Sequence, residues 1–208
     1  MYIPRKYQVR DMEEIETFIR ANPFGIVVTL KEGSPVATHI PLQLRTVDGE
    51  HYLTGHLAYG NAQWKAFGAD EEVLIIFQGP HSYISPSWYE QENVPTWNYQ
   101  AVHVYGKPEI MEGEELHRDL ALLMEKYEKH REHPVLWDTL SPELLETELK
   151  GIVGFKIRVG RIEAAFKLSQ NRSDSDYRNI IRHLGQEDDP LAADVAEAMG
   201  KIRPGETE

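Results

Sequence analysis

The segment from residue 78 to residue 100 carries the densest set of side chains suited to chemistry or binding. Rigid rings alternate there with hydrogen-bonding groups: His81, Ser82, Tyr83, Ser85, Ser87, Trp88, Tyr89, Thr96, Trp97, Asn98 and Tyr99. Pro80, Pro86 and Pro95 restrict its backbone. Aromatic rings supply contact area at low entropic cost, so the segment suits a preformed wall for a flat ligand. A loop that only covers its own core explains this segment equally well.

A second group of candidates is basic. Between residues 156 and 182 the cations outnumber the acids: Lys156, Arg158, Arg161, Lys167, Arg172, Arg178 and Arg182. These residues could bind a small anionic group. A solvated face balanced by neighbouring acidic residues is, however, the usual explanation of such runs. The stretch 55–61 is a further anion candidate, because a helix start after a strand presents free N–H groups to a phosphate. Ordinary capping explains Asn61 equally well.

Other site chemistries have weaker support. Of the nine histidines, His39 and His56 lie on adjacent predicted strands, and His130 and His133 share a predicted helix. Neither pair has a carboxylate at ligand spacing, so we expect no metal site. The chain has no Gly-x-Ser-x-Gly elbow, no P-loop and no Gly-x-Gly-x-x-Gly fingerprint. No catalytic residue can be assigned from the sequence.

Composition narrows the class of protein. The 208 residues are 41% hydrophobic, and no apolar run approaches the roughly 20 residues of a membrane span. Cysteine is absent, which excludes disulfides, iron–sulfur clusters and thiol nucleophiles, and we expect a cytoplasmic protein without a signal peptide. The net charge of -12 repels nucleic acid at long range.

The elements that must position these residues are predicted to be mainly strands. The expected strands are 24–31, 36–45, 50–57, 73–77, 101–105 and 152–166. The expected helices are 11–21, 61–67, 113–131, 142–150, 174–184 and 190–199, followed by a frayed end at 200–208. The first strands read as a meander, and the apolar run 73–77 breaks at Gln78-Gly79-Pro80. We expect a mainly β (α+β) fold with peripheral helices, whose sheet closes into a barrel.

Several motifs together resemble the PaiB-type FMN-binding negative transcriptional regulators, which have the FMN-binding split-barrel fold. They are MYIP at 1–4, ATHIPL at 37–42, GHLA at 55–58, GPHSYISPSWY at 79–89, VPTWNY at 94–99 and KLSQN at 167–171. The resemblance covers nearly the whole chain. It implies a single split-barrel domain over 1–208, with C-terminal helices at about 174–200. It also implies a homodimer that holds FMN at the subunit interface.

The resemblance also assigns residues to parts of the cofactor. It places Thr38 and His39 beside the isoalloxazine, and His56, Asn61 and Trp64 near the ribityl phosphate. Four residues would reach in from the other side: Lys167, Gln170, Asn171 and Arg172. The aromatic segment completes the cofactor-binding set with Tyr83, Ser85, Thr96, Trp97, Asn98 and Tyr99. Structural alternatives remain for His39 as a strand histidine, Trp64 as core and Lys167 as a surface residue.

Function stays open between classes. The family implies a negative transcriptional regulator, with control of protease production and sporulation. The charge and the lack of a helix-turn-helix with a basic second helix disfavour direct, tight DNA binding. A flavin-dependent oxidoreductase acting on a small molecule is the alternative, because the cofactor carries its own chemistry. A haem-binding split barrel is a third. The stripe Leu116, Leu120, Leu123, Met124 and Tyr127 is expected to pack in the core or against a second subunit.

Overall fold

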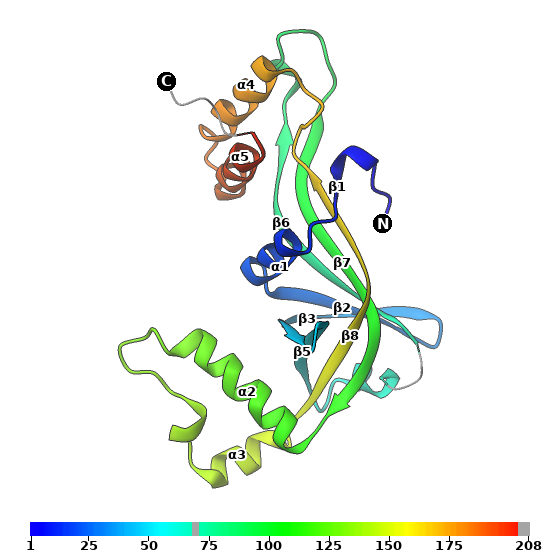
Figure 1. Ribbon diagram of the computed structural model, residues 1–208, viewed down its shortest axis with the longest axis vertical. Coiled ribbons are helices and arrows are strands. Elements are labelled where there is room, and N and C mark those ends of the chain that lie inside the picture. The colour runs from blue at the N-terminus through cyan, green and yellow to red at the C-terminus, as the bar shows by residue number, and fades with distance from the viewer. Residues whose placement is uncertain (68–70, 204–208) are drawn as a thin grey trace. The chain divides into compact units, whose positions relative to one another are not determined.

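The computed structural model describes residues 1–67 and 71–203 (Figure 1). Its strands are β1 (Gln8–Val9), β2 (Phe24–Lys31), β3 (Ser34–Pro41), β4 (Gln43–Val47), β5 (Glu50–Ala58), β6 (Val73–Ile84), β7 (Thr96–Met111) and β8 (Ile152–Lys167). Its α-helices are α1 (Met12–Ala21), α2 (Gly113–Glu128), α3 (Pro142–Leu149), α4 (Asp174–Leu184) and α5 (Pro190–Ile202). The 3-10 turns are η1 (Arg5–Tyr7), η2 (Ala62–Ala66), η3 (Pro86–Trp88) and η4 (Trp137–Thr139).

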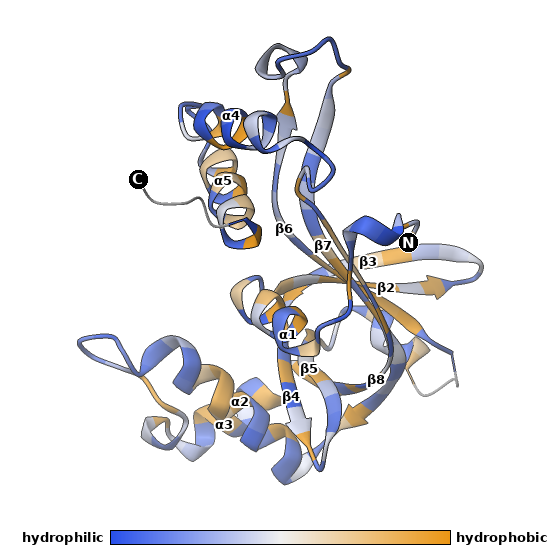
Figure 2. Ribbon diagram, turned by 45° about the horizontal axis from the view of Figure 1, so that its top comes forward, coloured by the Kyte–Doolittle hydropathy of each residue, from blue (hydrophilic) through white to orange (hydrophobic). Residues whose placement is uncertain are grey.

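The eight described strands form one antiparallel sheet. Its order is β3-β2-β6-β7-β8-β5-β4, and β1 pairs with β8. The prediction of a mainly β fold with peripheral helices is therefore confirmed. Hydrophilic and hydrophobic residues are interspersed along helices α1, α2 and α4 (Figure 2). No helix in the described ranges is both long enough and apolar enough to span a membrane.

The chain divides into two compact units. The first consists of residues 1–18 and 78–103 together with 163–203 of the described residues, and the second of residues 19–77 and 104–162. The boundaries fall within β6, β7 and β8, so each of these strands contributes residues to both units. The expectation of a single domain over 1–208 stays a prediction.

In the second unit, two hairpins add strands to the sheet. β2 pairs with β3 from Phe24↔Pro41 to Lys31↔Ser34, and β4 pairs with β5 across the turn at Asp48-Gly49. Both residues of that turn have positive φ, 52° and 80°, as a two-residue hairpin of the primed type requires. The hairpin that the Asp48-Gly49 pair predicted is therefore confirmed.

The core of the second unit follows the alternation of its strands. The largest fully buried side chains come from α1, from the strands and from the link between β3 and β4: Ile19, Leu42, Leu53, Leu57, Ile75, Phe77, Phe155 and Ile157. A satellite cluster of Met111, Leu116 and Leu120 places one face of α2 against partly buried Trp137 and Ile152. Burial of this apolar surface is the main stabilising term for the unit.

In the first unit, α4 and α5 pack on each other. Their inward residues are fully or almost fully buried: Tyr177, Ile180, Leu184, Ala192, Val195 and Met199. The Tyr177 hydroxyl donates to the Met199 carbonyl at 2.8 Å. The fully buried Asn98 of β7 donates its amide to Met199 Sδ at 3.4 Å. This contact fastens α5 to the strand that carries the aromatic candidates.

The structure corrects the extent of the aromatic loop. The predicted break at Gln78-Gly79-Pro80 does not occur, because β6 continues to Ile84 and β7 begins at Thr96 instead of 101. Gly79 is a packing glycine, since an added Cβ would lie 2.5 Å from Phe18 Cε2. The rings of Tyr83, Trp97 and Tyr99 are therefore on strands, and only residues 85–95 connect them.

Further corrections follow from the sheet. The predicted strand 36–45 is two strands, β3 and β4, because Leu42 turns away to donate its amide to the Pro23 carbonyl at 2.8 Å. These two strands stand at opposite ends of the strand order, so the first strands are not one meander. Helix α2 ends at Glu128, which leaves His130 and His133 beyond it instead of sharing a helix. Of the predicted frayed end, residues 200–202 are helical and 204–208 lie outside the described residues.

Candidate functional site

One candidate cluster lies in the second unit, where η2 meets β3. The Thr38 hydroxyl donates to Gln63 Oε1 at 2.5 Å and accepts from Asn61 Nδ2 at 2.9 Å. Gln63 Nε2 donates in turn to the carbonyls of Val27 and Val36 at 2.9 and 3.3 Å. Asn61 Oδ1 caps η2 by accepting from Gln63 N at 3.1 Å. Thr38 and Asn61 therefore build the local structure, around a glutamine that the sequence motifs did not single out.

Two ring residues flank this cluster in sequence. Trp64 Nε1 donates to the Tyr59 carbonyl at 2.9 Å, and the two rings lie 5.5 Å apart. His39 is exposed on β3 and stacks on Phe24, with 6.3 Å between ring centroids. Because η2 is a 3-10 turn of only five residues, it lacks the aligned amides with which an α-helix start attracts a phosphate. This part of the second unit therefore offers a ring surface instead of an anion site.

His56 lies half-buried on β5. Burial lowers the pKa of its imidazole below the ordinary value of 6.5, and the Asp119 carboxylate opposes this shift in part. A lowered pKa means that the folded chain binds this proton less readily than the unfolded chain. The contribution of His56 to stability is therefore complete above about pH 6.5 and decreases as the pH falls through the folded pKa.

We expect the substitution His56→Gln to flatten the fall in stability on acidification. The free energy of unfolding of the unsubstituted protein should decrease between about pH 7.5 and pH 5, and the variant should lose part of this slope because it carries no titrating imidazole there. Urea unfolding at several pH values measures the slope. The exposed His133 provides the control His133→Gln, and equal slopes in all three proteins would contradict the prediction.

A second candidate cluster lies in the first unit and is built around Lys167. Its ammonium donates to the Thr96 hydroxyl and to the Trp97 carbonyl. Burial lowers the pKa of this ammonium, and the nearby Arg172 and Lys6 lower it further. Within the described ranges no carboxylate forms an ion pair with Lys167 or Arg172. We call Lys6, Lys167 and Arg172 the cation cluster.

Two members of the cation cluster lie on aromatic faces. The Arg172 guanidinium is 4.4 Å from the centre of the Tyr89 ring, and the Lys6 ammonium is 5.0 Å from that of Tyr7. A ring attracts a cation through its quadrupole but does not neutralise its charge. The cation cluster therefore concentrates positive charge in a chain whose net charge is -12.

An exposed ring surface lies on β6 and β7 in the same unit. Trp97 is 53% exposed and Tyr83 45% exposed, and their centroids lie 6.0 Å apart at an interplanar angle of 72°. His81 lies 6.3 Å from Trp97. Trp97 joins this surface to the cation cluster, because its carbonyl accepts from Lys167. Exposed aromatic rings that cluster in this way are a candidate binding surface.

The turn that follows β8 gives several predicted ligand contacts structural roles. Gln170 Oε1 accepts from the Leu168 amide at 2.8 Å, and its Nε2 donates to the Phe166 carbonyl at 2.5 Å. Ser169 has a φ of 61° and donates to Asn98 Oδ1 at 3.1 Å. The side chain of the buried Asn98 therefore forms hydrogen bonds with Ser169 and with Met199 of α5. The side-chain oxygen and nitrogen of both Gln170 and Asn98 are therefore engaged in hydrogen bonds within the protein.

Other predicted residues are also engaged locally. The Asn171 amide oxygen accepts from the Tyr7 hydroxyl at 3.0 Å, and Ser85 Oγ caps η3 by accepting from the Ser87 amide at 3.3 Å. Tyr99 is half-buried on β7. Arg203, which the motifs did not include, donates to the carbonyls of residues 170 and 172. It supports the turn from a distant part of the chain, and no local sequence signal indicates such a contact.

The predicted basic window divides between the two units. In the second unit, Lys156 pairs with Glu115 at 2.8 Å and Arg158 pairs with Glu50 at 2.8 Å, as on an ordinary solvated face. Lys167 and Arg172 in the first unit have no such partners among the described residues. The anion-binding expectation therefore applies to the second half of the window. No three His, Asp or Glu side chains in the described ranges gather closely enough for a metal ion.

Comparison with known proteins identifies relatives of the chain. The model of the family described as "Putative FMN-binding domain" matches residues 1–161. The protease synthase and sporulation protein PAI 2 of Bacillus subtilis is 59% identical over 199 residues, which cover 96% of each chain. An uncharacterized protein of Emericella nidulans is 27% identical over 249 residues, covering 98% of this chain and 99% of its own.

Solved structures resemble the chain at lower identity. The flavocytochrome Anf3 of Azotobacter vinelandii has a TM-score of 0.63 at 15% identity, covering 85% of this chain and 78% of its own. The FAD and heme binding protein of Mycobacterium smegmatis has a TM-score of 0.61 at 15% identity, covering 83% and 79%. At such identity these likenesses show the fold alone, and they confirm the predicted split β-barrel.

Proposed function

Because this chain belongs to the FMN-binding domain family whose model covers residues 1–161, we propose that it binds FMN and acts as a regulatory flavoprotein of the PaiB type. The cation cluster carries this proposal. The phosphate of FMN is a dianion, and charge-assisted hydrogen bonds from ammonium and guanidinium groups are among the strongest that proteins form. Lys167 and Arg172 supply such donors without a competing carboxylate among the described residues.

The isoalloxazine has a matching surface in the same unit. It is flat and largely apolar, and the exposed rings of Trp97 and Tyr83 supply contact area with little loss of conformational freedom. His81 extends this surface. In the second unit, the exposed pair of His39 and Phe24 is a further ring surface. When bound, the flavin would supply redox chemistry of its own.

The remaining candidates enter the proposal with different roles. Thr96 would position the Lys167 ammonium, while Asn98 and Gln170 would hold the strand and turn that carry the cluster. The other candidates stay proposed neighbours of the cofactor, as the family resemblance implies: Thr38, His56, Asn61, Trp64, Ser85, Tyr99 and Asn171.

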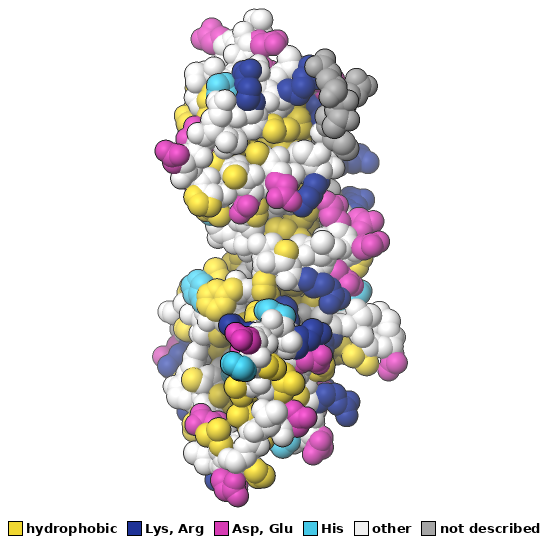
Figure 3. All heavy atoms as spheres, turned by 90° about the vertical axis from the view of Figure 1, so that its left-hand side faces the viewer, with side chains coloured by type: hydrophobic (Ala, Val, Ile, Leu, Met, Phe, Trp, Pro, Cys, Tyr) yellow, Lys and Arg dark blue, Asp and Glu magenta, His cyan; other side chains and the backbone are white. Residues whose placement is uncertain are grey.

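We further propose that the regulatory role is indirect or works through a partner, in the cytoplasm. The Bacillus subtilis relative is named for protease synthesis and sporulation, which makes their control the natural role to test. Acidic and basic side chains are interspersed over the face drawn in Figure 3, and the net charge is -12. A surface of this kind does not favour a tight complex with DNA phosphates.

The protein is expected to sediment as a homodimer at micromolar concentration. In the second unit, a mostly apolar groove of about 380 Å³ lies beside α2 and is lined by Leu123, Met124, Tyr127, Val135 and the acidic Glu128. Burial of such a surface against a second copy would remove it from water. Sedimentation velocity measures the mass, and a monomer at that concentration would contradict the proposal. The variant Leu123→Asp should shift the equilibrium towards monomer, whereas Leu191→Asp on the exposed surface of α5 should not.

The absorbance spectrum of the purified protein tests the cofactor assignment. Flavin bands, or a saturable titration with FMN that is tighter than that with riboflavin, are the expected result, because only FMN carries the phosphate. A haem Soret band instead would favour the haem-binding alternative, and a flavin that turns over with a small substrate would favour the oxidoreductase. Failure to bind either flavin would overturn the proposal.

A further inference from the structure

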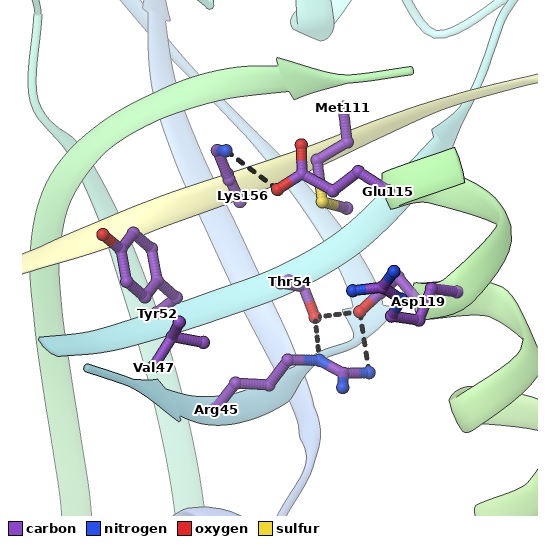
Figure 4. Close-up of a pocket in the computed structure, with 9 residues that line it drawn as sticks. Arg45, Val47, Tyr52, Thr54, Met111, Glu115, Asp119 and Lys156 are labelled. Carbon is purple, nitrogen blue, oxygen red and sulfur yellow. Dashed lines mark hydrogen bonds and ion pairs between the residues drawn. The ribbon is translucent and has the colours of Figure 1, made fainter. Parts of the chain in front are cut away.

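A pocket in the second unit is formed by one face of α2 over the strands β4, β5 and β8 (Figure 4). Glu115, Arg118 and Asp119 stand at helical positions i, i+3 and i+4, which share a face. Arg45 and Val47 of β4 stand two residues apart and therefore on one side of the sheet. The opposite strand contributes Tyr52 and Thr54, and β8 contributes Lys156 across from Thr54. The full lining is Arg45, Val47, Tyr52, Thr54, Met111, Glu115, Arg118, Asp119 and Lys156.

The two acids of the pocket are already neutralised. The Asp119 carboxylate, whose side chain is 6% exposed, accepts from Arg45 Nη2 at 2.8 Å and from the Thr54 hydroxyl at 2.7 Å. Glu115 pairs with the Lys156 ammonium at 2.8 Å (Figure 4). The buried Asp119 is held in place by these bonds, and the half-exposed Glu115 is paired with Lys156, so neither carboxylate is left without a counter-charge for a cationic ligand.

One cationic side chain of the lining, Arg118, is left unpaired among the described residues. Arg118 has no hydrogen-bond or ion-pair partner in the part of the chain that the structure describes. The lining holds three cationic side chains, Arg45, Arg118 and Lys156, against the two acids, so its formal charge is positive in a chain of net charge -12. A planar guanidinium with free donors matches a carboxylate in a bidentate geometry.

The rest of the lining is apolar. The ring of Tyr52 and the side chains of Val47 and Met111 supply walls, with Met111 only 2% exposed. The cavity volume is about 320 Å³, which falls at the lower end of the range for small-molecule sites. We propose that this pocket binds a small organic monocarboxylate with an apolar body, whose carboxylate pairs with Arg118. None of its lining residues belongs to the proposed flavin contacts.

Titration of the full-length protein with benzoate tests the proposal, with benzamide as the uncharged probe of the same shape. Benzoate should perturb the NMR signals of the Val47 and Met111 methyl groups in a saturable way and bind about tenfold or more tighter than benzamide, because only the anion forms charge-assisted bonds. The variant Arg118→Gln should lower benzoate affinity by about tenfold and leave benzamide affinity unchanged. Because Arg118 is exposed and has no partner among the described residues, this substitution should leave the melting temperature unchanged.

Two controls keep the outcome decisive. The variant Arg178→Gln, on the exposed surface of α4, removes the same charge elsewhere and should leave benzoate affinity unchanged. Arg118→Lys should retain part of the affinity, since it keeps the charge but not the fork. Equal affinities for benzoate and benzamide, an unaffected Arg118→Gln variant, or no perturbation at Val47 and Met111 would each overturn the proposal. Displacement of benzoate by FMN would overturn it as well, by making the pocket part of the flavin site.

Discussion

The substitution Lys167→Ala is expected to weaken FMN binding by about 10- to 150-fold and to change riboflavin binding by less than about twofold. A hydrogen bond to a charged group contributes about 1.5–3 kcal/mol, and only FMN offers a phosphate to receive it. The loss should be large because Lys167 lies beside Arg172 and Lys6 without a carboxylate partner among the described residues. Fluorescence titration of both flavins against the same protein measures the two affinities.

Controls separate the phosphate role of Lys167 from a structural role. Lys167 also holds the Thr96 hydroxyl and the Trp97 carbonyl, so its loss alone could disturb β7. Disturbance of the strand would weaken the binding of FMN and of riboflavin equally, and that result would contradict the prediction. Lys167→Arg should recover part of the FMN affinity, and Lys201→Ala on α5, where the side chain is 73% exposed, should leave it unchanged.

Trp97→Ala is the complementary variant for the ring surface. It should weaken the binding of FMN and of riboflavin about equally, since both ligands carry the isoalloxazine. A lower melting temperature with unchanged flavin affinity would show that Trp97 only packs the strand pair. Together with Lys167→Ala, this variant tells whether the two parts of the cofactor contact different residues.

Gly106→Ala is expected to cause the largest loss of stability among single-methyl additions, about 3 kcal/mol in the free energy of unfolding. An added Cβ at this position in β7 would lie 2.1 Å from the backbone carbonyl oxygen of Arg158 and 2.7 Å from Ile157 Cγ2. Backbone atoms cannot rotate away as the end of a side chain can. The strands β7 and β8 would have to separate where Ile157 is fully buried.

Urea unfolding followed by circular dichroism and tryptophan fluorescence measures this loss. The matched control is Gly60→Ala, because nothing lies within 4 Å of an added Cβ there. Its effect should stay within about 0.5 kcal/mol, as for ordinary surface substitutions. Similar stabilities of the two variants would show that β7 and β8 can move apart at little cost.

Local signals in the sequence were sufficient for one hairpin and for the ends of several helices. Asp48-Gly49 specified its hairpin, because those residue types tolerate the positive φ values that the turn requires. Ser141 before Pro142 specified the start of α3, and the Ser141 hydroxyl caps the Leu144 amide at 3.3 Å. Helix α4 begins at Asp174 and ends at Leu184, as its apolar spacing predicted. These features depend on residues within a few positions of each other.

The motifs identified the family, but they could not tell ligand contacts from structural ones. Asn98 and Gln170 stand in motifs beside Trp97 and Lys167, yet the first two are occupied by hydrogen bonds inside the protein. The partner of Asn98 on α5, Met199, is 101 residues away. Sequence proximity groups Asn98 with Trp97 and Gln170 with Lys167, whereas the role of each residue depends on which distant atoms contact it.

The sequence by itself therefore determined the fold class, the hairpin and helix signals and the family, because each rests on residue type and short-range spacing. The tertiary structure alone decided that β6 continues through Gly79, where Phe18 leaves no room for a side chain. It alone separated Lys167, without a carboxylate partner in the described ranges, from Lys156, which pairs with Glu115 forty-one residues earlier. The physical reason is that burial and charge pairing depend on side chains that folding brings together. When these side chains are far apart in the sequence, no local pattern indicates that they will meet.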